Sequence, residues 1–87
     1  MDEKLLETIN QKINEVFENV NEIKTIIDSL KILSSDKNSF AYGIVIGRLY
    51  NSFHYQCRRI LKRNPRPEEF EEFIELLKKH ESKFLNI

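Results

Sequence analysis

The residues best suited to chemistry lie close together in the middle of the chain. Arg48, His54 and Cys57 fall within one stretch, whereas the second histidine, His80, lies far from them in the sequence. His54 and Cys57 are three residues apart, a spacing at which one helix can offer two ligands to a metal ion. Two ligands do not complete a site, so we predict no metal and no cofactor. Cys57 falls on the apolar side of its predicted helix, where a free cysteine behaves as a small hydrophobic residue.

The stretch from Arg48 to His54 reads RLYNSFH. It resembles the Arg-x(4–6)-His signature of the HEPN ribonucleases, a family of α-helical and often dimeric proteins. The resemblance implies RNA cleavage by Arg48 and His54 at a dimer interface. An offset of six residues places the two side chains about 120° apart around one helix. A helical ribonuclease is therefore the weaker alternative for the function.

A cluster of cations follows this stretch. Residues 37–67 contain seven basic and no acidic residues. The flanking segments are acidic: residues 1–36 contain eight acidic and four basic residues, and residues 68–87 contain six acidic and three basic residues. The candidate binding residues are one aromatic and six basic side chains: Arg48, Tyr55, Arg58, Arg59, Lys62, Arg63 and Arg66. Cations interleaved with an aromatic ring are typical of surfaces that bind phosphates and stack nucleobases.

Two interpretations of this charge pattern remain open. In the first, the acidic segments neutralise the basic helix, within the chain or across an oligomer. In the second, the basic surface stays exposed for a nucleic acid or an acidic protein partner. The formal net charge of zero at pH 7 and a pI of about 6.7 favour the first, because domains that bind nucleic acids are usually basic. The acidic run is expected on a solvated helix face rather than in a catalytic cleft: Glu68, Glu69, Glu71, Glu72 and Glu75.

The first structural element predicted is a long amphipathic helix over about residues 2–33. Its apolar residues alternate at spacings of three and four, a heptad seam typical of coiled coils and bundles: Leu6, Ile9, Ile13, Val16, Val20, Ile23, Ile27 and Leu30. Four flanking residues widen this stripe: Leu5, Phe17, Ile26 and Leu33. A wide stripe favours a helical bundle over a two-stranded coiled coil.

Two breaks divide the remainder into two more helices. The polar residues 34–39 suit a short connection between antiparallel helices, and a second helix is predicted over about residues 39–63. Gly43 and Gly47 lie at one edge of its apolar face, which we interpret as a place where another helix approaches closely. The prolines at Pro65 and Pro67 end this helix and open a third over about residues 67–84.

The predicted fold is therefore an all-α chain of three helices in a single domain over residues 1–87. A long antiparallel hairpin carries a shorter C-terminal helix, which reaches only ~27 Å along a partner of ~45 Å. We expect a homo-oligomer, most simply a homodimer, to complete the bundle. The predicted function is a non-enzymatic interaction or assembly module, with a nucleic-acid-binding protein that uses the basic helix as the first alternative.

Composition sets the remaining expectations. A single cysteine, Cys57, excludes a disulfide within the chain and favours a reducing, cytoplasmic location. We expect no membrane partner, because the sequence has no apolar run of about 18 residues. The N-terminal residues lack the basic and then apolar pattern of a signal peptide.

Overall fold

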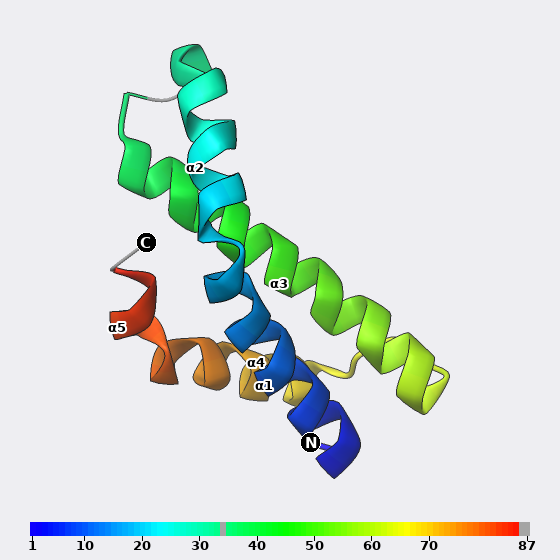
Figure 1. Ribbon diagram of the computed structural model, residues 1–87. Coiled ribbons are helices and arrows are strands. Elements are labelled where there is room, and N and C mark those ends of the chain that lie inside the picture. Colours follow the sequence, from blue (N-terminus) through cyan, green and yellow to red (C-terminus); the bar gives the residue numbers. More distant parts are fainter. Residues whose placement is uncertain (34, 86–87) are drawn as a thin grey trace.

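The chain folds into helices joined by short turns. The computed structural model describes residues 1–33 and 35–85 (Figure 1). Its elements are α1 (Glu3–Glu18), α2 (Val20–Ser29), the 3-10 turn η1 (Lys31–Leu33), α3 (Lys37–Leu61), α4 (Pro67–Lys79) and α5 (Glu81–Phe84). No strand occurs in these described ranges, so the all-α prediction is confirmed. The predicted break at 34–39 includes residue 34, which lies outside the described residues.

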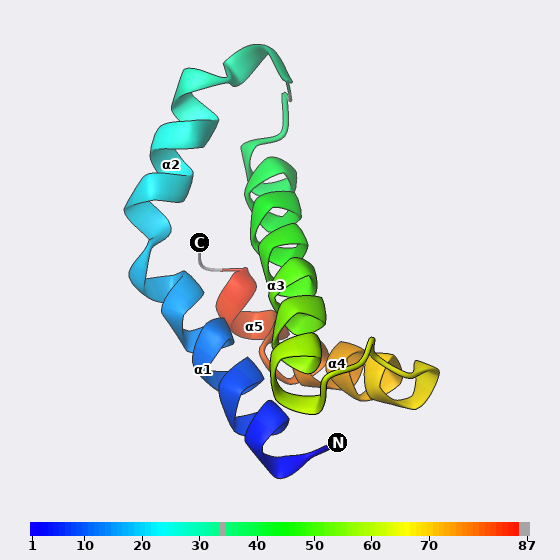
Figure 2. The same ribbon diagram turned by 90° about the vertical axis from the view of Figure 1, so that its right-hand side faces the viewer.

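The helices form two layers of unequal length: a first layer of α1, α2 and α3, and a shorter second layer of α4 and α5. α1 and α2 follow one another beside α3 and run in the opposite direction, with both packed against it (Figures 1 and 2). α4 crosses the end of this pair that carries the N-terminus, and α5 turns back toward the middle (Figure 2). Within the described residues, the other end consists of α2 and η1 beside the first half of α3. We call it the open end and define it as residues 20–33 and 35–47.

The continuous helix predicted over 2–33 is broken at Asn19, and the helix predicted over 67–84 is broken at His80. Both breaks have the same local cause. The Asn19 side-chain amide donates to the carbonyl oxygen of Glu15 at 3.1 Å, and His80 Nδ1 lies 2.9 Å from the carbonyl oxygen of Leu76. A polar side chain that bonds to the carbonyl four residues earlier competes with the helical backbone and bends or ends the helix.

The break at Asn19 changes which residues of the predicted seam are buried. Five seam residues lie in the core: Ile9, Ile13, Val16, Ile23 and Ile27. Leu5 is fully buried in place of Leu6, which is partly exposed, and Leu30 is exposed. Val20, directly after the break, is also only partly buried. The strict heptad is therefore wrong at both ends and at Asn19, where the helix is interrupted.

α3 is the central helix of the molecule and has a defined cap at each end. At its start, the Asp36 carboxylate accepts hydrogen bonds from the backbone N–H and the hydroxyl of Ser39, at 3.1 and 2.9 Å. These bonds hold the pKa of Asp36 below its usual value. At its end, Lys62 adopts a left-handed conformation with φ of 60°, and its N–H donates to the carbonyl of Arg58. α3 therefore spans 37–61 rather than the predicted 39–63.

Stacked phenylalanines attach the second layer to the first. The rings of Phe53 in α3 and Phe73 in α4 are parallel, with centroids 4.5 Å apart, and both side chains are fully buried. Phe84 in α5 stacks on Phe17 in α1 at 5.5 Å. Such pairs contribute about 0.5–1.5 kcal/mol beyond the apolar area that they bury, and Leu76 of α4 joins them in the buried core.

Gly43 and Gly47 lie on the exposed surface of α3. A Cβ atom built at either residue would meet nothing within 4 Å, so no helix of the same chain approaches them closely. Neither glycine has a positive φ. The close helix contact inferred from their spacing therefore stays a prediction that only another chain could satisfy.

Replacement of these glycines tests that contact. Gly43→Ala and Gly47→Ala should each raise the free energy of unfolding by about 1 kcal/mol, because alanine is the better helix former and the space is open. Urea unfolding followed by circular dichroism measures the change. A loss of stability in both variants would indicate that a second chain packs on this surface and would contradict the expectation for the isolated chain.

Candidate functional site

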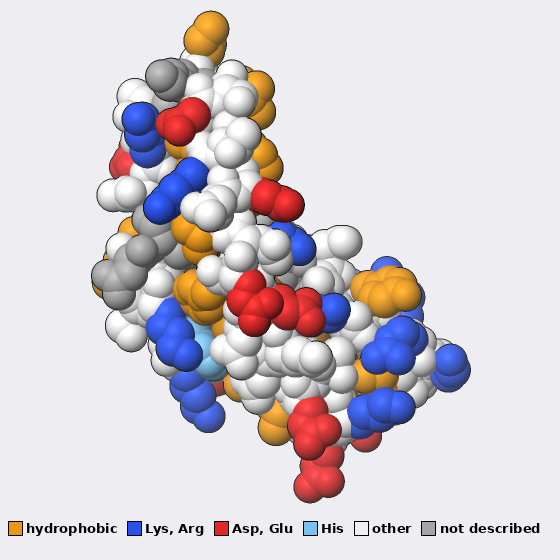
Figure 3. Space-filling view, viewed as in Figure 1, with side chains coloured by type: hydrophobic (Ala, Val, Ile, Leu, Met, Phe, Trp, Pro, Cys, Tyr) orange, Lys and Arg blue, Asp and Glu red, His pale blue; other side chains and the backbone are white. Residues whose placement is uncertain are grey.

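The basic cluster surrounds the corner at which α3 ends and α4 begins. Five of the six predicted basic residues have exposed side chains, and only Arg63 is partly buried. Exposed cations gather at one corner of the surface in Figure 3. α3 positions them because its last turns carry a cation at nearly every position that does not face the core: Arg58, Arg59 and Lys62.

One ion pair closes this corner. Arg63 Nη1 and Nη2 lie 2.6 and 3.1 Å from the two carboxylate oxygens of Glu69, which is buried. Glu69 Oε1 also accepts the backbone N–H of Arg66 at 2.9 Å. The hydrogen bonds from Arg63 and from that N–H lower the pKa of Glu69 from 4.5 to about 2, against the opposing effect of burial. The pair fixes the first turn of α4 against the end of α3.

The other cations of the cluster differ from Arg63 in their contacts. Among the described residues, no carboxylate forms an ion pair with the remaining five basic candidates: Arg48, Arg58, Arg59, Lys62 and Arg66. Arg59 Nε donates instead to the neutral side chain of Gln56 at 2.8 Å. Among the described residues, Arg63 therefore forms the direct ion pair, and Arg66 interacts electrostatically with the same carboxylate. Neutralisation of the other cations, within the chain or across an oligomer, stays a prediction.

Aromatic side chains lie beside these cations. The predicted stacking residue, Tyr55, is 55% exposed. A second group was not predicted: Tyr50 is 47% exposed, and its ring lies edge-to-face with His54 at 4.8 Å and Phe70 at 6.3 Å. The sequence signal for this exposure was the pair of prolines in the turn, Pro65 and Pro67. They direct α4 away from the axis of α3 and leave the rings of Tyr50 and Phe70 uncovered.

This aromatic group borders a pocket of about 320 Å³, which we call the corner pocket. Its lining residues come from α3 and from the turn and first residues of α4: Tyr50, Phe53, His54, Pro65, Arg66, Pro67 and Phe70. Arg66 is the only charged residue in this lining, and no carboxylate contributes to it. The pocket therefore combines aromatic surfaces with one guanidinium group.

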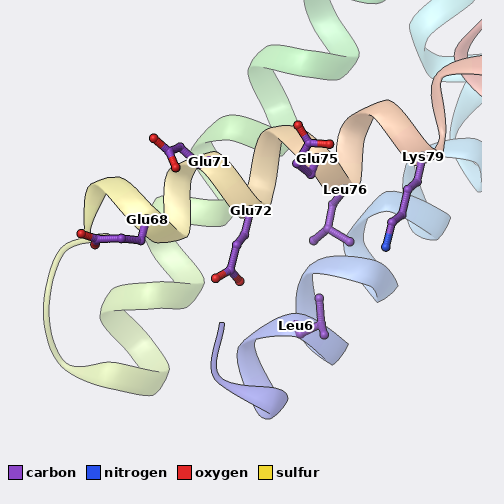
Figure 4. A pocket seen from close by; sticks show the side chains of 7 residues that line it. All are labelled: Leu6, Glu68, Glu71, Glu72, Glu75, Leu76 and Lys79. Atoms are coloured by element: carbon purple, nitrogen blue, oxygen red, sulfur yellow. The ribbon is translucent and has the colours of Figure 1, made fainter.

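An acidic groove lies on the other side of α4, between it and the start of α1 (Figure 4). Four carboxylates line it, with Leu6, Leu76 and Lys79: Glu68, Glu71, Glu72 and Glu75. The N-terminal ammonium of Met1 lies 2.6 Å from Glu72 Oε2. These exposed carboxylates agree with the predicted solvated face, whereas Glu69, from the same run, points into the corner ion pair.

The residues considered for catalysis or metal binding lie at different depths along α3. Cys57 is fully buried, and burial raises the pKa of its thiol, which disfavours the reactive thiolate. Arg48 is exposed, whereas His54 is partly buried against Tyr50. Within the part of the chain that the structure describes, no three His, Cys, Asp or Glu side chains are grouped as metal ligands.

A second candidate surface lies at the open end. Four large apolar side chains are exposed there: Ile26, Leu30, Ile32 and Leu33. Of these, Ile32 is 99% exposed. Ile23 and Ile27, in α2, are buried against α3. Of the four exposed residues, Ile26 lies in α2, whereas Leu30 caps that helix and Ile32 and Leu33 belong to η1. The exposed apolar surface is therefore concentrated at the tip of the open end.

Comparisons with known proteins give no match to a protein-family model, a curated protein or a solved structure. Across the described ranges, no helix is both long enough and apolar enough to cross a membrane. The function must therefore be argued from the two surfaces themselves, the basic corner and the open end.

The corner ion pair makes the folding stability of the protein depend on pH. The contribution of Glu69 is complete above pH 4.5 and is lost as the pH falls toward about 2, because a depressed pKa favours the folded state only while the group is ionised. Glu69→Gln should cost roughly 2 kcal/mol at pH 7 and flatten the fall in stability between these pH values. Thermal unfolding at a series of pH values measures both effects.

The matched control for this experiment is Glu68→Gln, which makes the same charge change at an exposed neighbouring position. It should leave stability within about 0.5 kcal/mol of the wild type. Equal losses in the two variants would contradict the role assigned to the buried pair.

Proposed function

We propose that this protein is a non-enzymatic helical assembly module that acts as a homodimer through the open end. The single observation that carries the proposal is the exposed apolar group on α2 and η1: Ile26, Leu30, Ile32 and Leu33. Four large apolar side chains at one end of a chain otherwise rich in charge are typical of an interaction surface. Two copies would bring α2 and the first half of α3 together twice, as a four-helix core.

The overall dimensions support an incomplete monomer. The chain exposes 5950 Å² of surface, whereas a compact monomer of this mass exposes about 5400 Å². Its radius of gyration is 13.9 Å, compared with about 12 Å for a compact domain of this length. Both differences have the direction expected when the second layer covers only part of the first.

A second copy of the chain is the partner that fits best. Charged residues of both signs lie near the apolar group, for example Lys24 and Asp28 in α2, so this surface does not demand a partner of one sign and can pair with itself across a two-fold axis. The formal net charge of zero also removes long-range repulsion between copies. The sequence predicts a long antiparallel hairpin with a shorter third helix. In this dimer, the symmetry mate would cover the part of the hairpin that the third helix does not reach.

A charge placed on this surface tests the dimer. Light scattering at micromolar concentration should give the wild type a mass about twice 10.4 kDa, and Leu33→Glu a mass of 10.4 kDa. An unpaired buried carboxylate costs several kcal/mol, and each 1.4 kcal/mol weakens association about tenfold. The matched control is Leu85→Glu, since Leu85 is 68% and Leu33 is 70% exposed.

The control should remain dimeric, because Leu85 follows α5 in the other layer. A wild type that stays monomeric throughout the micromolar range would refute the dimer. Dissociation by Leu85→Glu but not by Leu33→Glu would place the contact on a different surface and would refute the proposed interface.

A further inference from the structure

The corner pocket carries an inference that goes beyond self-association. It lies at the end of the molecule where α4 crosses, away from the open end (Figure 1). A monomer and the proposed dimer would therefore both leave it accessible. Its chemistry can be derived from three features, namely the exposed rings, the unpaired cations and the position of the acidic groove.

The rings offer flat surfaces of the right kind for a planar aromatic ligand. Tyr50 and Phe70 are 47% and 41% exposed, and their ring planes meet at 82°. A planar ligand that stacks on one of these rings would present its face to that ring and its edge to the other, an arrangement that aromatic systems favour. Because Phe53 lies in the lining and is fully buried, the pocket has an apolar floor.

Cations continue from the pocket along the outer side of α3. Arg66 belongs to the lining. His54 and Arg58 are four residues apart on one face of α3, and Lys62 follows them as the left-handed residue that ends the helix. Neither Arg58 nor Lys62 forms an ion pair with a carboxylate in the described structure. A ligand held in the pocket thus meets a row of positive charge in one direction only.

The acidic groove determines that direction. Glu68 and Glu72 line the groove between α4 and the start of α1, and Glu72 points toward α1 in Figure 4. A polyanion that leaves the pocket would be repelled on that side and attracted along α3. This charge arrangement favours an extended ligand with repeated negative charges, one end of which carries a planar ring.

We propose that the corner pocket binds a base of a single-stranded nucleic acid, whose phosphates contact Arg66, Arg58 and Lys62. Single strands present unstacked bases that exposed aromatic side chains can capture, together with a backbone that cations can follow. A duplex keeps its base faces stacked and has none to offer. An acidic peptide matches the cations but has no repeated planar group for the rings of Tyr50 and Phe70.

Fluorescence anisotropy with labelled oligo-dT and oligo-U of about ten nucleotides tests the site. Both strands should bind at low salt, and a duplex of equal length should bind more weakly. The logarithm of the association constant should fall with the logarithm of salt concentration with a slope of about −2, as expected for three phosphate contacts. A difference between the two strands would show whether the site prefers RNA or DNA.

Tyr50→Ala should weaken binding of the single strand about tenfold, the effect of one stacked base. The matched aromatic control is Tyr42→Ala, which removes a partly exposed ring near the start of α3, outside the pocket lining, and should change affinity less than twofold. Arg66→Ser removes one cation and keeps a residue suited to a helix N-cap. Its matched control is Lys24→Ser on α2, which makes the same charge change far from the corner.

Three outcomes would overturn the proposal. One is the absence of single-strand binding by the wild type at low salt. Another is an equal loss in Tyr50→Ala and Tyr42→Ala, with both variants shown by circular dichroism to be folded. A third is binding of poly-glutamate that weakens as strongly in Tyr50→Ala, which would assign the pocket to an acidic protein partner. The masses measured for the dimer do not affect any of these results.

Discussion

The difference in length between α3 and the helices that cross it is the constraint on which the rest of the structure depends. α3 has 25 residues and α4 has 13, or about 37 and 20 Å at 1.5 Å per residue. A helix can bury an apolar stripe only where another helix lies against it. α4 and α5 reach only one half of α3, so that half has three-sided packing and the other half has α2 alone. The exposed apolar group at the open end is the direct result.

The corner between α3 and α4 follows from the same constraint, since α4 must turn sharply to cross the hairpin end. Three local features achieve the turn: the left-handed Lys62, the Arg63–Glu69 pair and the prolines around Arg66. Arg63 holds the turn through its ion pair with Glu69. The turn leaves the neighbouring cations exposed. The turn also tilts α4 away from Tyr50 and creates the corner pocket. Folding and the arrangement of charge are thus coupled at one place in the chain.

Local sequence signals predicted the helices well but not their relative positions. Apolar periodicity and Pro67 identified the helical segments and the start of α4, because both act within a few residues. The breaks at Asn19 and His80 were missed because each depends on one side-chain hydrogen bond. The basic candidates were identified by composition, yet their exposure remained open until α4 was placed. The ion pair of Glu69 and the exposure of Tyr50 both depend on the crossing of two helices, which periodicity does not encode.

The unequal layers also imply unequal local stability along one short chain. Backbone amides in α1 and the second half of α3 are covered by the phenylalanine stacks, so they should exchange with solvent only when the whole domain unfolds. Amides of α2 lie over a single neighbouring helix and follow the break at Asn19, so a local opening can release them without disturbing the corner. The molecule would then contain a rigid end and a readily opened end. A partner that covers the open end would slow exchange in α2 first, which gives a residue-level signature of assembly.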